Sequence, residues 1–159
     1  MKINSPYKYN NGYIYLSVAA DGVDIESTIQ VSDEKLYRKS EFHISLVCVR
    51  DLLVQFPSVT EAQVVSFFNR FTGGKDLSQF SYVPEQRIAK HPDGRMSLIQ
   101  MVVVPGLKDF FDELNDRFDI SVDTQPTHIT LYTRQKNNGI GINNNTQLHN
   151  TRLFIENRL

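Results

Sequence analysis

The sequence predicts a single α+β domain, residues 1–159, built from antiparallel strands and two amphipathic helices. Its 159 residues suit one domain with a substantial hydrophobic core. Short stretches that alternate polar and apolar residues predict half-buried strands, and two stretches with apolar residues at helical spacing predict helices. A pattern of four residues that occurs once in each half of the chain suggests a site with rough internal two-fold symmetry.

The repeated pattern reads His, apolar, hydroxyl, apolar. It occurs at His43–Leu46, as His-Ile-Ser-Leu, and again at His128–Leu131, as His-Ile-Thr-Leu. Because residues i and i+2 of a strand share a face, each histidine should point to the same side as its hydroxyl neighbour. The two apolar residues of each copy should then point into the core. Two imidazoles, each beside a hydroxyl, predict an acid–base pair around a phosphate.

Strand and helix signals follow in order through the first half. Residues 13–18 alternate strongly and predict the first strand. The stretch that follows is ambiguous, and we interpret residues 33–38 as a short helix. The first copy of the pattern lies in a strand over residues 41–49. Thr60 begins a capping box, with Gln63 as its partner, and the helix that follows should end at Gly73-Gly74.

The second half predicts a hairpin, a helix and a further strand. The turn His91-Pro92-Asp93-Gly94 should join strands over residues 80–90 and 95–104. One apolar stripe predicts the second helix and consists of Leu107, Phe110, Phe111, Leu114 and Phe118. The second copy of the pattern lies in a strand over residues 127–133. The Asn- and Gly-rich residues 134–147 predict a mobile loop, and residues 148–156 can form a last strand.

Composition excludes several classes of function. The net charge of −1 argues against a general surface for duplex DNA, although one pocket could still hold a nucleotide or a short single strand. Cys48 is the only cysteine, so the chain has no internal disulfide and fits a reducing compartment. No signal-like N-terminus and no membrane-length apolar run are present. We therefore expect a cytoplasmic monomer that does not bind membranes.

Other catalytic patterns are missing from the sequence. There is no His-x-x-x-His, no Glu-x-x-His and no cysteine pair, so we expect no metal and no cofactor. A Ser–His–Asp hydrolase is disfavoured because no Gly-x-Ser-x-Gly elbow occurs. A Gly-rich phosphate loop is absent as well.

The two copies, 85 residues apart, resemble the paired motifs of the 2H phosphoesterase superfamily. That superfamily includes cyclic phosphodiesterases, RNA-ligase-like proteins, 2′,5′-oligoadenylate phosphodiesterases and RNA 3′-end trimming enzymes. The resemblance covers nearly the whole chain, and residues 41–46 are most similar to the RNA-trimming branch. It implies two lobes of antiparallel sheet that face a cleft, with one motif from each lobe. It also implies metal-independent catalysis, with His43 and His128 as acid and base and with Ser45 and Thr130 as donors to the phosphate.

Tyrosines near the motifs are further candidates. By alternation Tyr132 falls on the face of His128 and Thr130, where a nucleobase could stack on it; the alternative is a tyrosine on an edge strand, half covered by the Asn-rich loop. Tyr13 and Tyr15 share one face of the first strand; they could line the cleft, but we expect them at the edge of the core.

These observations predict a phosphodiesterase that acts on a nucleotide or short oligonucleotide. Three substrate classes remain open: RNA 3′ ends or 2′,3′-cyclic phosphates, 2′,5′-linked oligoadenylates, and cyclic oligonucleotide messengers of signalling or defence. The sequence does not assign the roles of acid and base to the two histidines. The alternatives are an RNA-binding module of the 2H fold without turnover, and an unrelated α+β scaffold in which the repeat is a coincidence.

Overall fold

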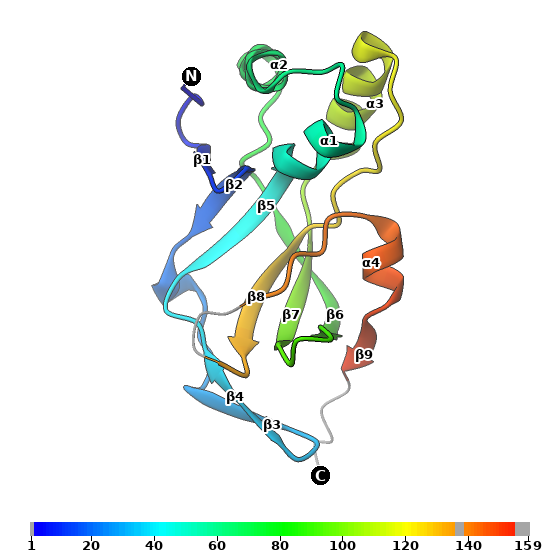
Figure 1. Cartoon of the computed structure of the whole chain (residues 1–159). Coiled ribbons are helices and arrows are strands. Elements are labelled where there is room, and N and C mark those ends of the chain that lie inside the picture. The colour runs from blue at the N-terminus through cyan, green and yellow to red at the C-terminus, as the bar shows by residue number, and fades with distance from the viewer. Residues whose placement is uncertain (1, 136–138, 155–159) are drawn as a thin grey trace.

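The computed structural model describes residues 2–135 and 139–154, and it has an α+β fold (Figure 1). In this part of the chain there are nine strands, four α-helices and one short 3₁₀ turn. The strands are β1 (Lys8–Asn10), β2 (Tyr13–Val18), β3 (Thr28–Val31), β4 (Glu34–Arg38), β5 (Phe42–Cys48), β6 (Ser81–Lys90), β7 (Met96–Val103), β8 (His128–Thr133) and β9 (Arg152–Phe154). The helices are α1 (Val49–Gln55), α2 (Glu61–Gly74), α3 (Leu107–Phe118) and α4 (Asn145–His149).

The nine strands belong to one sheet, in which all the pairings are antiparallel. The order along the sheet is β1-β2-β5-β8-β7-β6-β9. Strands β3 and β4 lie outside this order: they pair with each other, and β4 also pairs with β8. The two strands that carry the repeated pattern are therefore neighbours in the middle of the sheet, where Ile44 pairs with Ile129. The predicted class is confirmed at the level of an α+β fold with antiparallel strands. The strands of both halves of the chain lie in one sheet rather than in two separate ones.

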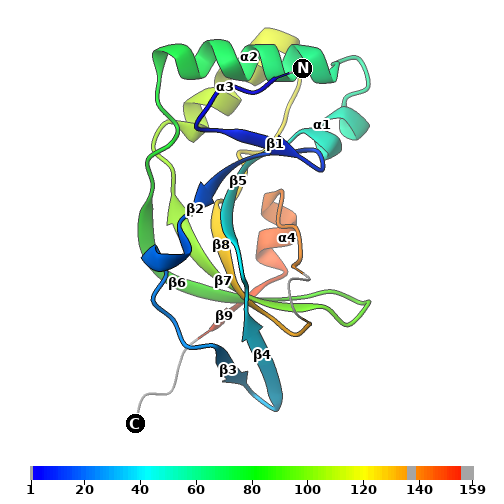
Figure 2. The same cartoon turned by 90° about the vertical axis from the view of Figure 1, so that its left-hand side faces the viewer.

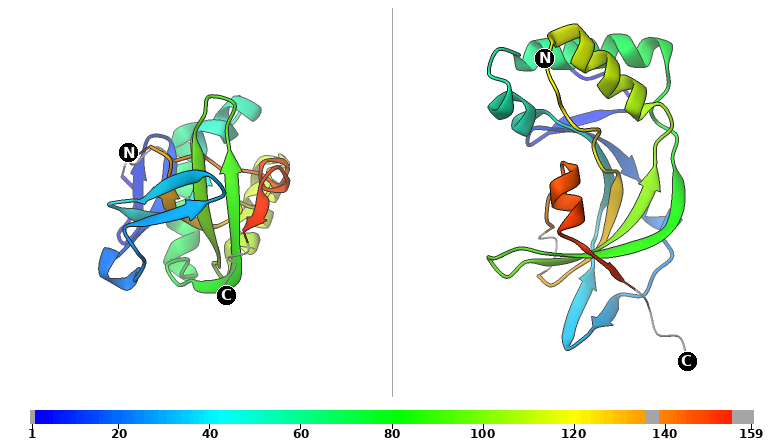
Figure 3. Two further views of the ribbon diagram at one scale, coloured as in Figure 1. Left: turned by 90° about the horizontal axis from the view of Figure 1, so that it is seen from below. Right: turned by 90° about the vertical axis from the view of Figure 1, so that its right-hand side faces the viewer.

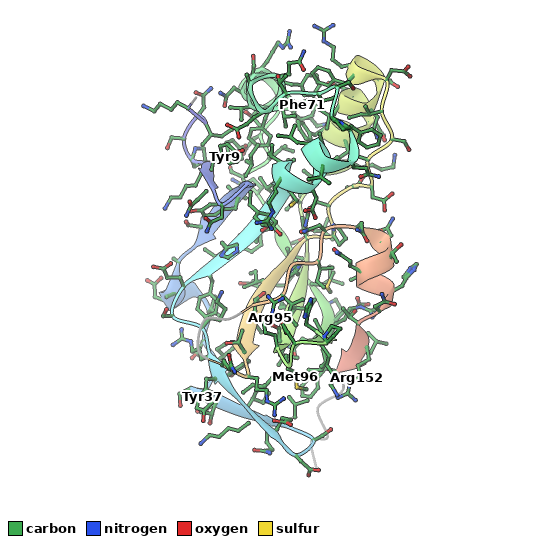
Figure 4. The ribbon with its side chains drawn as sticks, in the orientation of Figure 1. Tyr9, Tyr37, Phe71, Arg95, Met96 and Arg152 are labelled. Carbon is green, nitrogen blue, oxygen red and sulfur yellow. The ribbon has the colours of Figure 1, made fainter. Side chains whose placement is uncertain are left out.

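Helices α1, α2 and α3 gather at one end of the molecule, and the β3–β4 hairpin lies at the other end (Figures 1 and 2). Local sequence explains α2, because the Thr60 hydroxyl accepts from Gln63 N and the Gln63 side chain accepts from Thr60 N. The apolar stripe of α3 packs against α2, with the Phe110 ring 5.4 Å from that of Phe68 and 5.3 Å from that of Phe71. Phe71 lies among the side chains between these helices (Figure 4).

A second, smaller apolar cluster lies on the other face of the sheet. Ile140 and Ile142 pack there against Ile99 and Met101 of β7. Helix α4 lies on the concave side of β6 and β7 (right-hand view of Figure 3). The predicted loop is therefore right for residues 139–144, which have no regular secondary structure although Ile140 and Ile142 are buried, and wrong for residues 145–147, which belong to helix α4. Residues 136–138, which belong to the same predicted loop, lie outside the described residues.

Other elements differ from the prediction as well, and strands β1 and β3 were not predicted. Residues 34–38 form strand β4 rather than a helix, because a tight turn at Ser32, with φ of 52°, lets them pair with β3 while Leu36 becomes fully buried. Helix α1 was not predicted, since no capping signal precedes it. Strand β9 confirms the last predicted strand only over Arg152–Phe154. The prediction is wrong at residues 148 and 149, which belong to helix α4, and residues 155 and 156 lie outside the described range. In the described ranges, none of the helices is both long and apolar enough to cross a membrane.

Candidate functional site

One cleft of about 690 Å³ contains both copies of the repeated pattern. Four of the predicted site residues line it: His43, Ser45, His128 and Thr130. Strands β5 and β8 supply these four side chains, while β2 and residues 139–143 contribute other parts of the wall. The cleft thus joins residues from both halves of the chain, which the repeat of the pattern suggested; strand alternation predicted only that each histidine shares a face with the hydroxyl two residues later.

The pairing of β5 with β8 explains how the four residues come together. Ile44 lies opposite Ile129, and in an antiparallel pair the residues on either side of such a match face each other across the strands. Extending the register by one residue sets His43 opposite Thr130 and Ser45 opposite His128. Each imidazole therefore lies across from the hydroxyl of the other copy.

Both strands contain a β-bulge immediately after the hydroxyl residue. In β5, Ser45 pairs with Tyr15 of β2 but Val47 pairs with Ile14, so Leu46 is the extra residue. In β8, Thr130 pairs with Ile99 of β7 but Tyr132 pairs with Leu98, so Leu131 is the extra residue. A bulge of this kind shifts the alternation of a strand and is frequent beside active sites.

The bulge in β8 corrects the prediction for Tyr132. One extra residue moves every later side chain to the opposite face, so Tyr132 does not line the cleft and is only 4 % exposed in the main core. Its hydroxyl donates to the Glu26 carbonyl oxygen at 2.8 Å. The side chain is therefore turned away from the face on which a base could stack beside His128.

His128 is buried, with 9 % of its surface exposed. Its Nδ1 lies 3.2 Å from the carbonyl oxygen of Pro126, and because a carbonyl can only accept, Nδ1 carries the hydrogen. Burial lowers the pKa of His128 to about 4; the Pro126 bond opposes this change, and the charge of His43 adds to it. At neutral pH the ring is therefore neutral, and Nε2 is left with a lone pair that can accept a proton.

His43 lies at a more open position on the same cleft. The ring of Tyr15 stands edge-on to it, with 5.4 Å between centroids and 61° between planes. Although part of His43 is open to solvent, the surrounding protein atoms penalise its charged form and lower its pKa. The Lys39 ammonium lowers that pKa further, and the Glu41 carboxylate opposes the change.

Several residues of the cleft were not predicted. Lys39, Arg50 and Arg95 line it as cations, and Asn143 bonds at 2.9 Å both to the Tyr13 hydroxyl oxygen and to the Asp51 carboxylate. Tyr13 and Tyr15 were expected at the core edge, but both line the cleft. Their shared face on the first strand was the one sequence signal for this position. The cations gave no local signal, because long-range strand pairing brings them to the cleft.

The donor set of the cleft does not resemble a metal centre. Across residues 2–135 and 139–154, no group of three or more His, Cys, Asp or Glu side chains is placed to hold a metal ion. Comparison with known proteins returns no relative: no family model, no curated protein and no solved structure matches this chain.

Proposed function

We propose that this protein is a phosphodiesterase of the 2H type that cleaves nucleotides or short oligonucleotides without a metal. The observation that carries the proposal is the meeting of His43, Ser45, His128 and Thr130 in one cleft. Candidate bonds are 2′,3′-cyclic or 2′,5′-linked phosphodiesters and related linkages in signalling or defence nucleotides. The likeness to the superfamily rests on the two motifs and on their strand pairing.

The repeated bulge supports a two-fold relation between the motifs. The axis of an antiparallel pair passes between matched residues, so an axis at Ile44 and Ile129 relates His43 to His128 and Ser45 to Thr130. Leu46 and Leu131, the extra residues of the two bulges, are related by the same offset of 85 residues as the histidines. A coincidental repeat of four residues would not account for equivalent bulges.

The environments of the two histidines suggest their roles. In-line cleavage needs a base for the entering nucleophile, which is water or a neighbouring ribose hydroxyl, and an acid for the leaving oxygen. His128 suits the base, because its pKa of about 4 keeps it neutral and Nε2 is free to accept. His43 then protonates the leaving alkoxide. Ser45 and Thr130 donate to the non-bridging oxygens as negative charge develops.

A substrate panel with matched histidine variants tests the proposal. The panel consists of 2′,3′-cyclic nucleotides, 2′,5′-oligoadenylate, 3′,5′-RNA and cyclic dinucleotides, with products identified by mass. We expect His43→Ala and His128→Ala each to lower turnover by about 10²–10⁴-fold, the range for loss of a general acid or base. His149→Ala is the matched control, because this histidine is exposed on α4, outside the cleft.

Three outcomes would count against the proposal. Near-full turnover in either cleft variant would exclude a paired mechanism. Loss of turnover with EDTA, restored by Zn²⁺ or Mn²⁺, would indicate metal-dependent chemistry instead. If no substrate in the panel is cleaved but oligonucleotides still bind, the alternative of an RNA-binding module would replace the enzyme.

A further inference from the structure

Lys39 is held next to the motif strands by its backbone. Its N–H donates at 2.9 Å to the carbonyl oxygen of Leu131, the extra residue of the β8 bulge. It lies in the short connection between β4 and β5, four residues before His43. The bulge at Leu131 therefore has two effects: it turns Tyr132 into the core, and its carbonyl oxygen holds the Lys39 backbone beside the cleft.

The Lys39 ammonium lies on the side of the cleft where Thr130 and His43 meet. A Cβ atom built on Gly139 would lie 3.9 Å from Lys39 Nζ and equally 3.9 Å from Thr130 Cγ2, so both groups border the same small space. The ammonium is also close enough to His43 to act on its ionisation. Lys39, Thr130, His43 and His128 all line the cleft.

The burial of Lys39 calls for an anionic partner. Its side chain is half buried, and burial lowers its pKa, because desolvation penalises the ammonium. Within the part of the chain that the structure describes, Lys39 forms no ion pair. Glu41 is the carboxylate that acts on both Lys39 and His43, and it lies at the exposed side of the cleft. A half-buried ammonium has lost part of its hydration, and a bound anion would compensate for that loss.

We propose that Lys39 is a further catalytic residue whose ammonium binds the phosphate group on which His43 and His128 act. This inference rests on the proposed function and adds a positively charged side chain to the proposed site. A neutral imidazole pair does not attract an anion, whereas an ammonium attracts the phosphate and stabilises the charge that builds on its oxygens. The bound phosphate in turn offsets the effect of Lys39 on His43, which raises the proton affinity of the acid.

Inorganic phosphate and NMR titration of the histidines test this role without any turnover. The variants are Lys39→Gln and Lys39→Arg in the full chain, with Lys35→Gln as control, because Lys35 is an exposed lysine of β4 outside the cleft. We expect Lys39→Gln to weaken phosphate binding about 10–100-fold, the loss expected for one charged hydrogen bond. The pKa of His43 should rise in the same variant, since a positive neighbour has been removed. Lys39→Arg should retain most of the binding.

The outcomes separate this inference from the proposed function. Equal phosphate affinity in Lys39→Gln and the parent, or an unchanged His43 pKa, would overturn the role of Lys39. So would the absence of phosphate binding in the parent protein. If phosphate binding depends on Lys39 but no phosphodiester in the panel is cleaved, the phosphate site stands and the enzyme proposal falls. If the panel is cleaved and Lys39→Gln cleaves it at the parent rate, the enzyme proposal stands and Lys39 is not catalytic.

Discussion

His128 and His43 line the same cleft, and both have a pKa below the ordinary value of a histidine. The pKa of His128 is lowered to about 4 by burial, whereas His43, in a more open position, has a pKa below its ordinary value of 6.5. As base, His128 must be neutral, so kcat/KM should rise with pH through about 4. If His43 is the acid it must be protonated, so kcat/KM should fall again as the pH rises through the pKa of His43, which lies below 6.5. The limbs belong to the coupled pair, and a rate that climbs steadily to pH 9 would refute this assignment.

The hydroxyl residues should change the height of that pH profile and leave its shape intact. In the proposed mechanism, Ser45→Ala and Thr130→Ala would each remove one donor to a charged phosphate, and such a bond contributes roughly 1.5–3 kcal/mol. We therefore expect each to lower kcat/KM by about 10–100-fold at every pH. The measurement is a full pH profile for each variant. A displaced limb would mean that the hydroxyl acts on the ionisation of a histidine.

Folding stability should also depend on His128. Its pKa is about 4 in the folded chain but ordinary in the unfolded chain, so between pH 6.5 and 4 the unfolded state binds the extra proton. The free energy of unfolding should be fully retained above pH 6.5 and fall by roughly 3 kcal/mol on acidification to pH 4. Urea denaturation at several pH values measures this slope. In His128→Asn, whose amide can still donate to Pro126, the loss of unfolding free energy between pH 6.5 and pH 4 should be smaller by that amount. An equal loss in this variant would exclude His128 as its source.

Among the elements, the β1–β2 turn is under tight conformational constraint. Gly12 has φ of +79°, and a Cβ atom there would lie only 2.6 Å from Arg50 Cβ. The Arg50 guanidinium lies 5.6 Å from the centre of the Tyr13 ring, at one end of the cleft. Gly12→Ala should therefore lower the free energy of unfolding by about 1–3 kcal/mol. Gly22→Ala is the matched control, since nothing lies within 4 Å of its Cβ position. Equal effects would show that the turn tolerates a side chain.

Elements with local signals were predictable from the sequence, and those that depend on distant partners were not. The capping box at Thr60 defines the start of α2 within four residues, and both of its hydrogen bonds are present. Strand β4 was misassigned because the turn that joins it to β3, Ser32-Asp33, lacks the Asn-Gly or Gly-containing signal of a hairpin, and because its other partner, β8, is distant in the chain. The bulges at Leu46 and Leu131 carry no sequence signature, so alternation was followed one residue too far, to Tyr132.

In the whole molecule, the aromatic cluster of the main core lies away from the cleft, because none of its phenylalanines on α2 and α3 lines it. Phe110 is fully buried and contacts the rings of Phe67, Phe68, Phe71 and Phe111 at the helical end. Phe110→Ala should lower the free energy of unfolding by about 3–5 kcal/mol, because it leaves a large cavity. Val54→Ala should change it by less than about 0.5 kcal/mol, since Val54 is 77 % exposed. Urea denaturation checks both values, and a small loss in Phe110→Ala would mean that the helical end repacks.

The candidate site was predictable only where strand alternation operates. His43, Ser45, His128 and Thr130 could be placed on one face because each pair is two residues apart on a strand. Lys39 reaches the cleft through the carbonyl oxygen of Leu131, 92 residues further along the chain, and Arg95 lies near β8 because β7 pairs with it (Figure 4). Contacts at such separations depend on the complete sheet, and a local pattern does not reveal them.

In mechanical terms, the motif strands β5 and β8 join at the match of Ile44 with Ile129, and β4 adds a second connection because it also pairs with β8. Each histidine is one residue from this match, a distance of about 3.3 Å along its strand. Tyr13 pairs with Cys48, four residues from Ile44. For the same small rotation between the two strands, we expect Tyr13 to be displaced roughly four times as far as the histidines. The far wall of the cleft should therefore adapt to ligands of different size more readily than the two histidines change their separation.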